Sequence, residues 1–144
     1  MLSCDIVIAR NDTFFRTPEV NVGLFPMMIG ALLYRNVGRK KAMDMVLTGR
    51  KVWAPEAEAM GLITRAVDPA SLDQEVEKTL DLLTSKSPIG TRIGKDAFRA
   101  MSDMPFDEAV DHLCEALNRV LCTEDAAEGM AAFIQKRTPE FKGK

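Results

Sequence analysis

The sequence predicts an α+β protein that is mostly helical. One short β-branched apolar run, residues 4–9, has the pattern of a strand buried on both faces. Two weaker strand candidates follow at residues 13–16 and 62–67, and most of the remaining chain shows helical periodicity. A strand buried on both faces needs neighbouring strands and covering layers. The chain offers few of them, so we expect a short, truncated sheet followed by helices.

Helices are indicated by apolar stripes with helical spacing and by residues typical of helix ends. They are predicted over residues 30–37, 39–48, 55–60, 71–84, 88–101, 106–121 and 123–136. Gly49 follows the second of these at the position where a left-handed residue ends many helices. Ser71 and Gln74 have the spacing of a capping box, and Thr123 or Asp125 is expected to cap the last helix.

The apolar stripes also predict which helix faces are covered. The stripe that we expect to be buried on the helix over residues 71–84 consists of Leu72, Val76, Leu80 and Leu83. Later helices carry further apolar residues beside the main stripe, for example Phe98, Met104 and Cys114. A helix that is apolar on more than one face usually packs against more than one neighbour. A second copy of the chain is therefore an expected neighbour.

Length, charge and cysteine content narrow the function classes. The 144 residues correspond to one domain or two small ones, and the 19 basic and 21 acidic side chains give a net charge of −2. Such a chain has no general attraction for nucleic acid. No apolar stretch approaches the ~18–20 residues of a membrane span, and Asp5 interrupts the first apolar run, which argues against a signal peptide. The three cysteines suggest no disulfide framework, so we expect a reduced, cytoplasmic protein.

Glu19 is the residue whose position suggests acid–base chemistry. It follows the strand candidates, and Pro18 restricts both its own backbone and that of Thr17. The neighbours Val20 and Val22 are apolar, and apolar surroundings disfavour the charged form of a carboxyl, which suits it to proton transfer. The alternative is an ordinary solvent-exposed loop glutamate, and the residue pattern by itself favours that alternative.

The other reactive side chains indicate no site. His112 is the only histidine, and no Ser-His-Asp or Cys-His arrangement can be read from its spacing, so we expect it to be solvated or hydrogen-bonded in the core. The cysteines are expected to act as small inert apolar residues. No metal-ligand spacing and no glycine-rich phosphate-binding loop occurs in the sequence.

Eight short motifs, each occurring once, follow one another along the chain. They are Cys4-Asp5-Ile6-Val7-Ile8-Ala9, Pro18-Glu19-Val20, Val22-Gly23-Leu24-Phe25-Pro26, Gly38-Arg39-Lys40-Lys41-Ala42-Met43, Leu47-Thr48-Gly49-Arg50, Glu56-Ala57 with Gly61-Leu62-Ile63, Glu128-Gly129-Met130, and Phe133-Ile134-Gln135-Lys136-Arg137-Thr138-Pro139-Glu140-Phe141. In order and spacing they resemble the C-terminal half of the enoyl-CoA hydratase/isomerase (crotonase) family.

The resemblance implies a crotonase-type spiral fold, with residues 1–70 as a remnant of its core and residues 71–144 as a helical region that forms trimers or hexamers. It implies an enzyme that adds water to, or shifts, the double bond of an enoyl-CoA thioester, with Glu19 as general acid and base. Phe133 and Lys136 match positions that contact CoA, often from an adjacent subunit. The resemblance implies no metal or redox cofactor, because coenzyme A is part of the substrate.

The chain also departs from the family pattern. The second catalytic glutamate and both oxyanion-hole loops would precede Met1, so we expect this chain alone to be inactive. Met27, Met28 and Ile29 stand where the family commonly has a glycine-rich stretch, which predicts a differently shaped acyl pocket. Two alternatives stay open on this basis: a catalytically incomplete oligomerisation module, and a pseudoenzyme that binds acyl-CoA.

Overall fold

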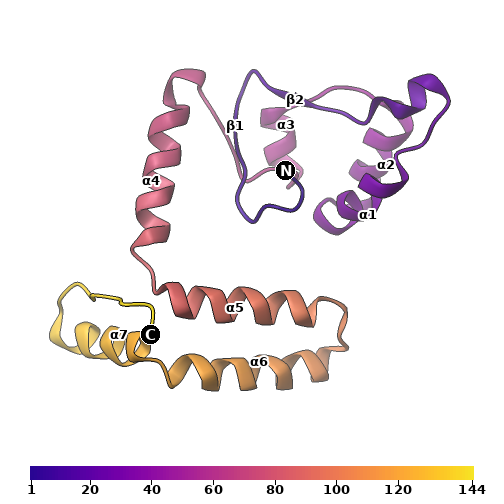
Figure 1. Ribbon diagram of the computed structural model, residues 1–144. Helices are drawn as coiled ribbons and strands as arrows, with labels where there is room; N and C mark the ends of the chain where they lie inside the picture. Colours follow the sequence, from indigo (N-terminus) through magenta and orange to yellow (C-terminus); the bar gives the residue numbers. More distant parts are fainter. The chain divides into compact units, whose positions relative to one another are not determined.

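Two small sheets lie in the N-terminal part of the chain (Figure 1). In the computed structural model, which describes residues 1–144, β1 (Ile8–Arg10) pairs in parallel with β4 (Arg65–Val67). Strand β2 (Phe14–Phe15) pairs antiparallel with β3 (Val52–Trp53). The expectation of a strand at residues 4–9 buried on both faces was wrong: β1 is three residues long and only partly buried. The reason is that β4 is its only neighbouring strand.

The chain divides into two compact units, Met1–Lys78 and Thr79–Lys144. The first unit contains both sheets, and its helical elements are η1 (Pro18–Val22, a 3₁₀ helix), α1 (Met27–Asn36), α2 (Arg39–Thr48), α3 (Ala54–Ala59) and η2 (Pro69–Ser71, also 3₁₀). Helix α2 has the predicted bounds, and Gly49 ends it in the left-handed conformation, with φ 57°. The expectation that residues 1–70 are a core remnant and residues 71–144 an oligomerisation region stays a prediction.

The core of the first unit forms where α1, α2 and α3 meet the two short sheets. Its buried members are Leu33, Val37, Ala42, Met45, Val46, Val52, Ala54, Ala57, Leu62 and Ile63. Small residues such as Ala42 and Ala57 let the helices approach closely, and the larger side chains fill the remaining space. This core supports the loop that joins β2 to α1.

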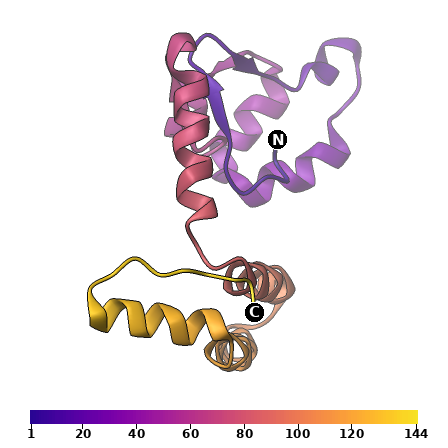
Figure 2. The same ribbon diagram turned by 60° about the vertical axis from the view of Figure 1, so that its left-hand side comes forward.

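The second unit is a helical layer. Helix α4 (Leu72–Thr84) contains the boundary between the units, and the helices after it are α5 (Pro88–Ala100), α6 (Phe106–Leu121) and α7 (Glu124–Gln135), with the short 3₁₀ helix η3 (Met101–Asp103) between α5 and α6. Helices α5 and α6 lie side by side in both views (Figures 1 and 2). None of the helices is long and apolar enough to cross a membrane.

Helix ends in this part of the chain confirm one prediction and correct another. The Thr123 hydroxyl accepts a hydrogen bond from the Ala126 N–H at 3.1 Å and caps α7 as predicted. The capping box of Ser71 and Gln74 does not form. Instead the Asp68 carboxylate accepts from the Ala70 N–H at 2.9 Å and caps η2, the turn that leads into α4.

Helix α4 does not bury the stripe expected of it. Leu80 and Leu83 are each 48% exposed, and only Thr79 is buried on this helix. The physical reason is that the helices packed closely against one another in the second unit are α5, α6 and α7, and α4 packs closely against none of them. Amphipathic spacing predicts an apolar face, but it does not specify what covers that face.

The residues after α7 form an ordered strap, which we define as residues 137–144 (Figure 2). Asp125 is only 1% exposed, and its carboxylate accepts hydrogen bonds from the backbone N–H groups of Lys142 at 2.7 Å and Gly143 at 3.1 Å. The Ser87 hydroxyl donates to the same carboxylate at 2.7 Å. Burial disfavours the charge of Asp125, but these hydrogen bonds together hold the pKa of its carboxyl below the ordinary value. One buried carboxylate therefore ties the strap to the first turn of α5.

A second carboxylate fixes the start of the strap. Arg137 donates to Glu128 Oε2 at 2.8 Å, and the Glu140 N–H donates to Glu128 Oε1 at 2.9 Å. The hydrogen bond from Arg137, supported by that from Glu140, lowers the pKa of Glu128 from 4.5 to about 2.

This lowered pKa predicts loss of stability in acid. A carboxyl with a pKa lower in the folded chain than in the unfolded chain stabilises the fold above its unfolded pKa, and that contribution is lost as the pH falls. We therefore expect the thermal unfolding temperature, followed by circular dichroism, to fall as the pH is lowered from 4.5 towards 2. The Glu128→Gln variant should show a flatter profile over the same range, and a parallel decline in both proteins would contradict the assignment.

Candidate active site

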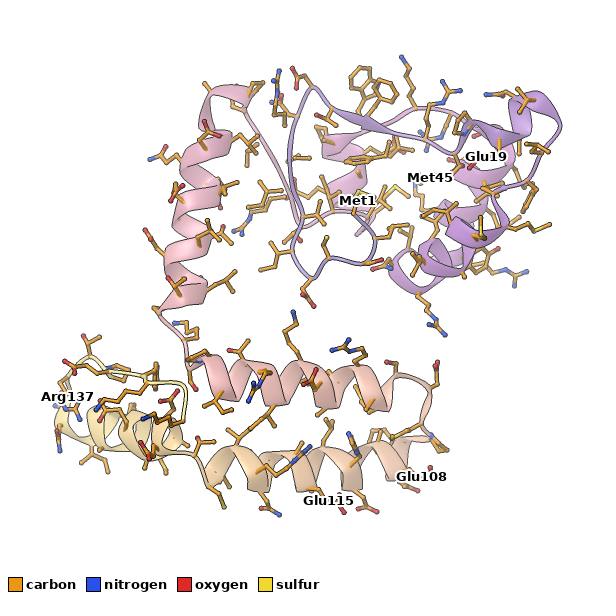
Figure 3. The ribbon with its side chains drawn as sticks, in the orientation of Figure 1. Met1, Glu19, Met45, Glu108, Glu115 and Arg137 are labelled. Atoms are coloured by element: carbon orange, nitrogen blue, oxygen red, sulfur yellow. The ribbon has the colours of Figure 1, made fainter.

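The 3₁₀ helix η1 carries Glu19, the residue that the sequence predicts to be catalytic (Figure 3). Pro18 occupies the first position of η1, where its fixed φ is compatible with a helical turn and its missing N–H costs nothing. Gly23 ends the turn with φ 77°, a conformation that glycine adopts readily. The carboxylate therefore sits on a short, tightly defined turn.

Thr17 joins this turn to the C-terminal end of α2. Thr17 is only 7% exposed, and its hydroxyl donates to the Met45 carbonyl at 3.1 Å. The same carbonyl accepts the Gly49 N–H at 3.0 Å. One backbone oxygen of α2 thus fixes both the entry to the Glu19 turn and the end of its own helix.

Gly49 is where this contact is tightest. A Cβ atom added to it would lie 3.0 Å from Val20 Cγ2, 3.1 Å from the Thr17 carbonyl oxygen and 3.3 Å from Asn21 Nδ2. All three groups belong to η1 or to the residue before it. The absence of a side chain at Gly49 is therefore what allows the end of α2 to pack against the turn that carries Glu19.

Arg50 fixes the segment after Gly49. Its guanidinium donates to both oxygens of Glu56, at 2.9 and 2.6 Å, and its Nε donates to Asp44 at 2.7 Å. The bidentate hydrogen bonding from Arg50 lowers the pKa of the Glu56 carboxyl from its ordinary value. These partly exposed ion pairs link α2 to α3 beside the Glu19 turn.

Glu19 borders a cavity of about 420 Å³ in which it is the only charged residue. The other residues that line it are Phe25, Pro26, Met27, Met28, Ile29 and Leu32. Oε2 of Glu19 is buried and has no hydrogen-bond partner in the protein. Glu19 is therefore not the fully exposed loop glutamate of the alternative interpretation. A carboxylate oxygen that is buried but unpartnered, next to an apolar cavity, is free to exchange a proton with a bound molecule.

A second cavity of about 400 Å³ lies in the same unit and has mainly apolar walls. Its lining residues are Met1, Leu2, Phe14, Phe15, Arg16, Thr17, Ile29, Leu33, Met45 and Leu62. Ile29 of α1 lines both cavities. Met28, one of the three residues for which the resemblance predicts a differently shaped acyl pocket, is 92% exposed at the rim of the Glu19 cavity.

The two predicted CoA-contacting residues lie together at the end of α7. Phe133 is 85% exposed, and Lys136 follows one turn later in the left-handed conformation, with φ 54°. The Lys136 N–H donates to the Phe133 carbonyl at 3.2 Å, which fixes their spacing. Both side chains are open to solvent and to a ligand.

The remaining reactive side chains form no further centre. No group of three or more His, Cys, Asp or Glu residues is arranged to hold a metal ion. All three cysteines are free and exposed. His112 is partly buried and its Nε2 lacks a hydrogen-bond partner, which corrects the expectation of a solvated or hydrogen-bonded ring. The sequence neighbours of His112 indicate a helix, but they do not show which face of that helix another element covers.

Sequence reasoning missed the residues that hold Glu19 in place. Gly49 was expected only to end a helix, and Thr17 was noted only as the residue before Pro18. The packing between them joins positions about thirty residues apart, as the separation of 28 between Thr17 and Met45 shows. No local pattern signals such a contact, although a left-handed glycine is a usual sign of close backbone approach.

Together these features define a helix-rich α+β protein in which a single carboxylate borders an apolar cavity. The chain belongs to the enoyl-CoA hydratase/isomerase family, which it matches over residues 1–144. It is 37% identical over 141 residues to a probable enoyl-CoA hydratase of Mycobacterium bovis, covering 97% of this chain and 55% of that protein. It is 33% identical over 147 residues to the 2,3-dehydroadipyl-CoA hydratase of Escherichia coli, covering 99% and 56%.

Solved structures show the same fold. The enoyl-CoA hydratase of Mycobacterium smegmatis superimposes with a TM-score of 0.94 at 34% identity, over 97% of this chain and 55% of that one. Human enoyl-CoA hydratase domain-containing protein 3 superimposes with a TM-score of 0.93 at 36% identity, over 97% and 55%. The fold is thus the crotonase type, mostly helical with small sheets. The chain spans about half the length of these relatives, and its placement in their C-terminal half stays a prediction.

Proposed function

We propose that this chain is part of an enzyme that hydrates or isomerises an enoyl-CoA thioester, with Glu19 as the group that moves the proton. The observation that carries the proposal is the buried, unpartnered Oε2 of Glu19 beside an otherwise apolar cavity. An apolar cavity suits an acyl chain, and a carboxylate that no protein group neutralises keeps its capacity for proton transfer. Family membership supports the same chemistry.

The proposed step follows from the chemistry of a conjugated thioester. In hydration, the oxygen of water bonds to the β-carbon, the double bond becomes an enolate, and a proton is added at the α-carbon. Water loses one proton as its oxygen bonds to the β-carbon, and the α-carbon gains one proton. Glu19 carries out one of these two transfers and a carboxylate outside this chain the other, so that proton exchange with solvent returns both groups to their starting state. In isomerisation the same carboxylate removes a proton at one carbon and returns it at another. Two N–H donors to the thioester oxygen, which the family mechanism requires, would come from residues outside this chain.

Phe133 and Lys136 are proposed to contact the CoA portion of the substrate. Lys136 supplies a positive charge that suits a phosphate, and Phe133 an exposed aromatic face. The exposed apolar side chains of the second unit support assembly into a homotrimer or a hexamer. They include Phe106 and Ile134, which are 81% and 79% exposed. Large exposed apolar side chains on neighbouring helices are typical of surfaces that another chain covers.

The test is turnover of a short trans-2-enoyl-CoA, followed by loss of the absorbance of its conjugated double bond. The chain is assayed alone and joined to the part of the Mycobacterium smegmatis enoyl-CoA hydratase that it does not match. We expect the joined protein to convert the substrate and the chain alone not to. A folded joined protein without turnover would contradict the proposal. If the chain alone then sedimented as a stable oligomer, the oligomerisation module would be the favoured function.

A further inference from the structure

The second unit contains a groove of about 660 Å³ that the proposed chemistry at Glu19 does not use. We call it the basic groove, and its lining residues are Leu83, Thr84, Lys86, Pro88, Thr91, Arg92, Lys95, Asp96, Arg99 and Phe141. They come from the end of α4, the connection that follows it, one face of α5 and the strap. The volume lies within the range of about 300–1,000 Å³ that is usual for small-molecule sites.

The groove is strongly positive. It contains four cationic side chains and one carboxylate, whereas the whole chain has a net charge of −2. The carboxylate, Asp96, is already engaged by Arg99, which donates to it at 2.7 Å. Lys86 and Arg92 are exposed and have no carboxylate partner in the protein. Lys86 and Arg92 therefore bring positive charge to the groove that no carboxylate of the protein neutralises.

The arrangement on α5 concentrates this charge on one face. Arg92, Lys95 and Arg99 are three, then four residues apart, so their side chains emerge on the same side of the helix. Like charges at this spacing repel one another and lower the stability of a helix. An anion bound among them would relieve that repulsion while gaining several charge-assisted hydrogen bonds.

The strap forms one wall of the basic groove, and hydrogen bonds within the protein hold it in place without a ligand. The strap carries Phe141, whose ring packs 3.5 Å from the position of a Cβ on Gly129. Asp125 holds the strap through the backbone of Lys142 and Gly143, as described above. A wall anchored by a buried carboxylate loses little conformational entropy on binding. Phe141 remains half-buried and lines the groove, together with the apolar Leu83 and Pro88.

We propose that the basic groove binds a nucleoside diphosphate. The cationic face of α5 matches the two phosphates, since Arg binds phosphate oxygens in a two-pronged geometry and Lys as a point charge. The aromatic ring of Phe141 and the apolar residues beside it match a planar base, which stacks on aromatic side chains. This site is distinct from the proposed CoA contacts, because Phe133 and Lys136 do not line the groove.

Calorimetric titration of the 144-residue chain with ADP tests the inference. We expect saturable binding that weakens as salt is raised. Adenosine and inorganic pyrophosphate should each bind at least ~10-fold more weakly than ADP, because each lacks half of the recognised groups. Absence of saturation by ADP, or equal affinity for adenosine, would overturn the proposal.

Charge-matched variants locate the binding. Arg92→Gln should weaken ADP binding at least ~10-fold by removing a charged hydrogen-bond donor. Phe141→Leu should weaken binding of ADP but not of pyrophosphate. Arg119→Gln, which removes an exposed cation on α6, should have no effect. If Lys136→Gln abolished ADP binding while Arg92→Gln did not, the nucleotide would be occupying the proposed CoA contact, and the groove would be excluded. Neither result depends on turnover at Glu19.

Discussion

Glu19→Gln is expected to reduce turnover of an enoyl-CoA by about 10²–10⁴-fold, the usual contribution of a general acid or base. The amide has nearly the shape of the carboxylate but cannot take up or release a proton at this pH. In the proposed function the apolar lining of the cavity holds the acyl chain, so we expect the loss in kcat with little change in KM. The measurement is steady-state kinetics of the joined protein described above.

A matched substitution separates this effect from general loss of charge. Glu77 is exposed on α4, and Glu77→Gln makes the same chemical change away from either cavity. It should leave kcat unaltered. Glu19→Gln should also leave the thermal unfolding temperature at least as high as that of the unaltered protein, since Oε2 of Glu19 is buried without a hydrogen-bond donor. Normal turnover by Glu19→Gln would remove Glu19 from the mechanism.

Local signals explain which parts of the fold could be predicted. Helix α2 has the predicted bounds because its apolar stripe and Gly49 at its end both act within a few residues. Thr123 caps α7 for the same reason. The strand at residues 4–9 is shorter than predicted, because the length of a strand depends on a partner elsewhere in the chain.

Burial was harder to predict than secondary structure. The spacing of Leu80 and Leu83 correctly indicates a helix with an apolar face, but both side chains remain half exposed. Asp125 is a charged residue that is buried although no sequence pattern indicated it. It was considered as a helix cap, and it is instead a buried carboxylate that binds the strap. Its partners at residues 142 and 143 have no sequence pattern that marks them as donors, because they donate through the backbone.

The sequence names Glu19 as a candidate, and its catalytic role stays a prediction. The contacts that hold Glu19 in place could not be predicted. Pro18 and the apolar residues beside it suggested Glu19. The motifs along the chain suggested the enoyl-CoA hydratase/isomerase family, and the family match over residues 1–144 confirms it. The contact between Gly49 and the turn that carries Glu19 depends on packing between segments distant in sequence. A side chain added at Gly49 would disturb this contact.

Gly49→Ala is expected to lower both stability and turnover. An Ala in the left-handed conformation costs about 1–2 kcal/mol, and crowding of a tightly packed contact costs about 1–3 kcal/mol more, so we expect a loss of roughly 2–5 kcal/mol. The nearest obstacles are Val20 Cγ2 at 3.0 Å and the Thr17 carbonyl oxygen at 3.1 Å, and the latter is backbone that moves only with η1. The turn that carries Glu19 must therefore shift, and a misplacement of about 1 Å can reduce turnover by about 10²-fold.

Gly30→Ala is the matched control for this substitution. Gly30 lies inside α1 with nothing within 4 Å of an added Cβ, so alanine there should raise the free energy of unfolding by about 0.5–1 kcal/mol. Chemical denaturation gives both changes in stability, and kinetics measured well below the unfolding temperature separate displacement of Glu19 from unfolding. A Gly49→Ala protein that is destabilised but keeps full kcat would limit Gly49 to a structural role. Unchanged stability would contradict the packing itself.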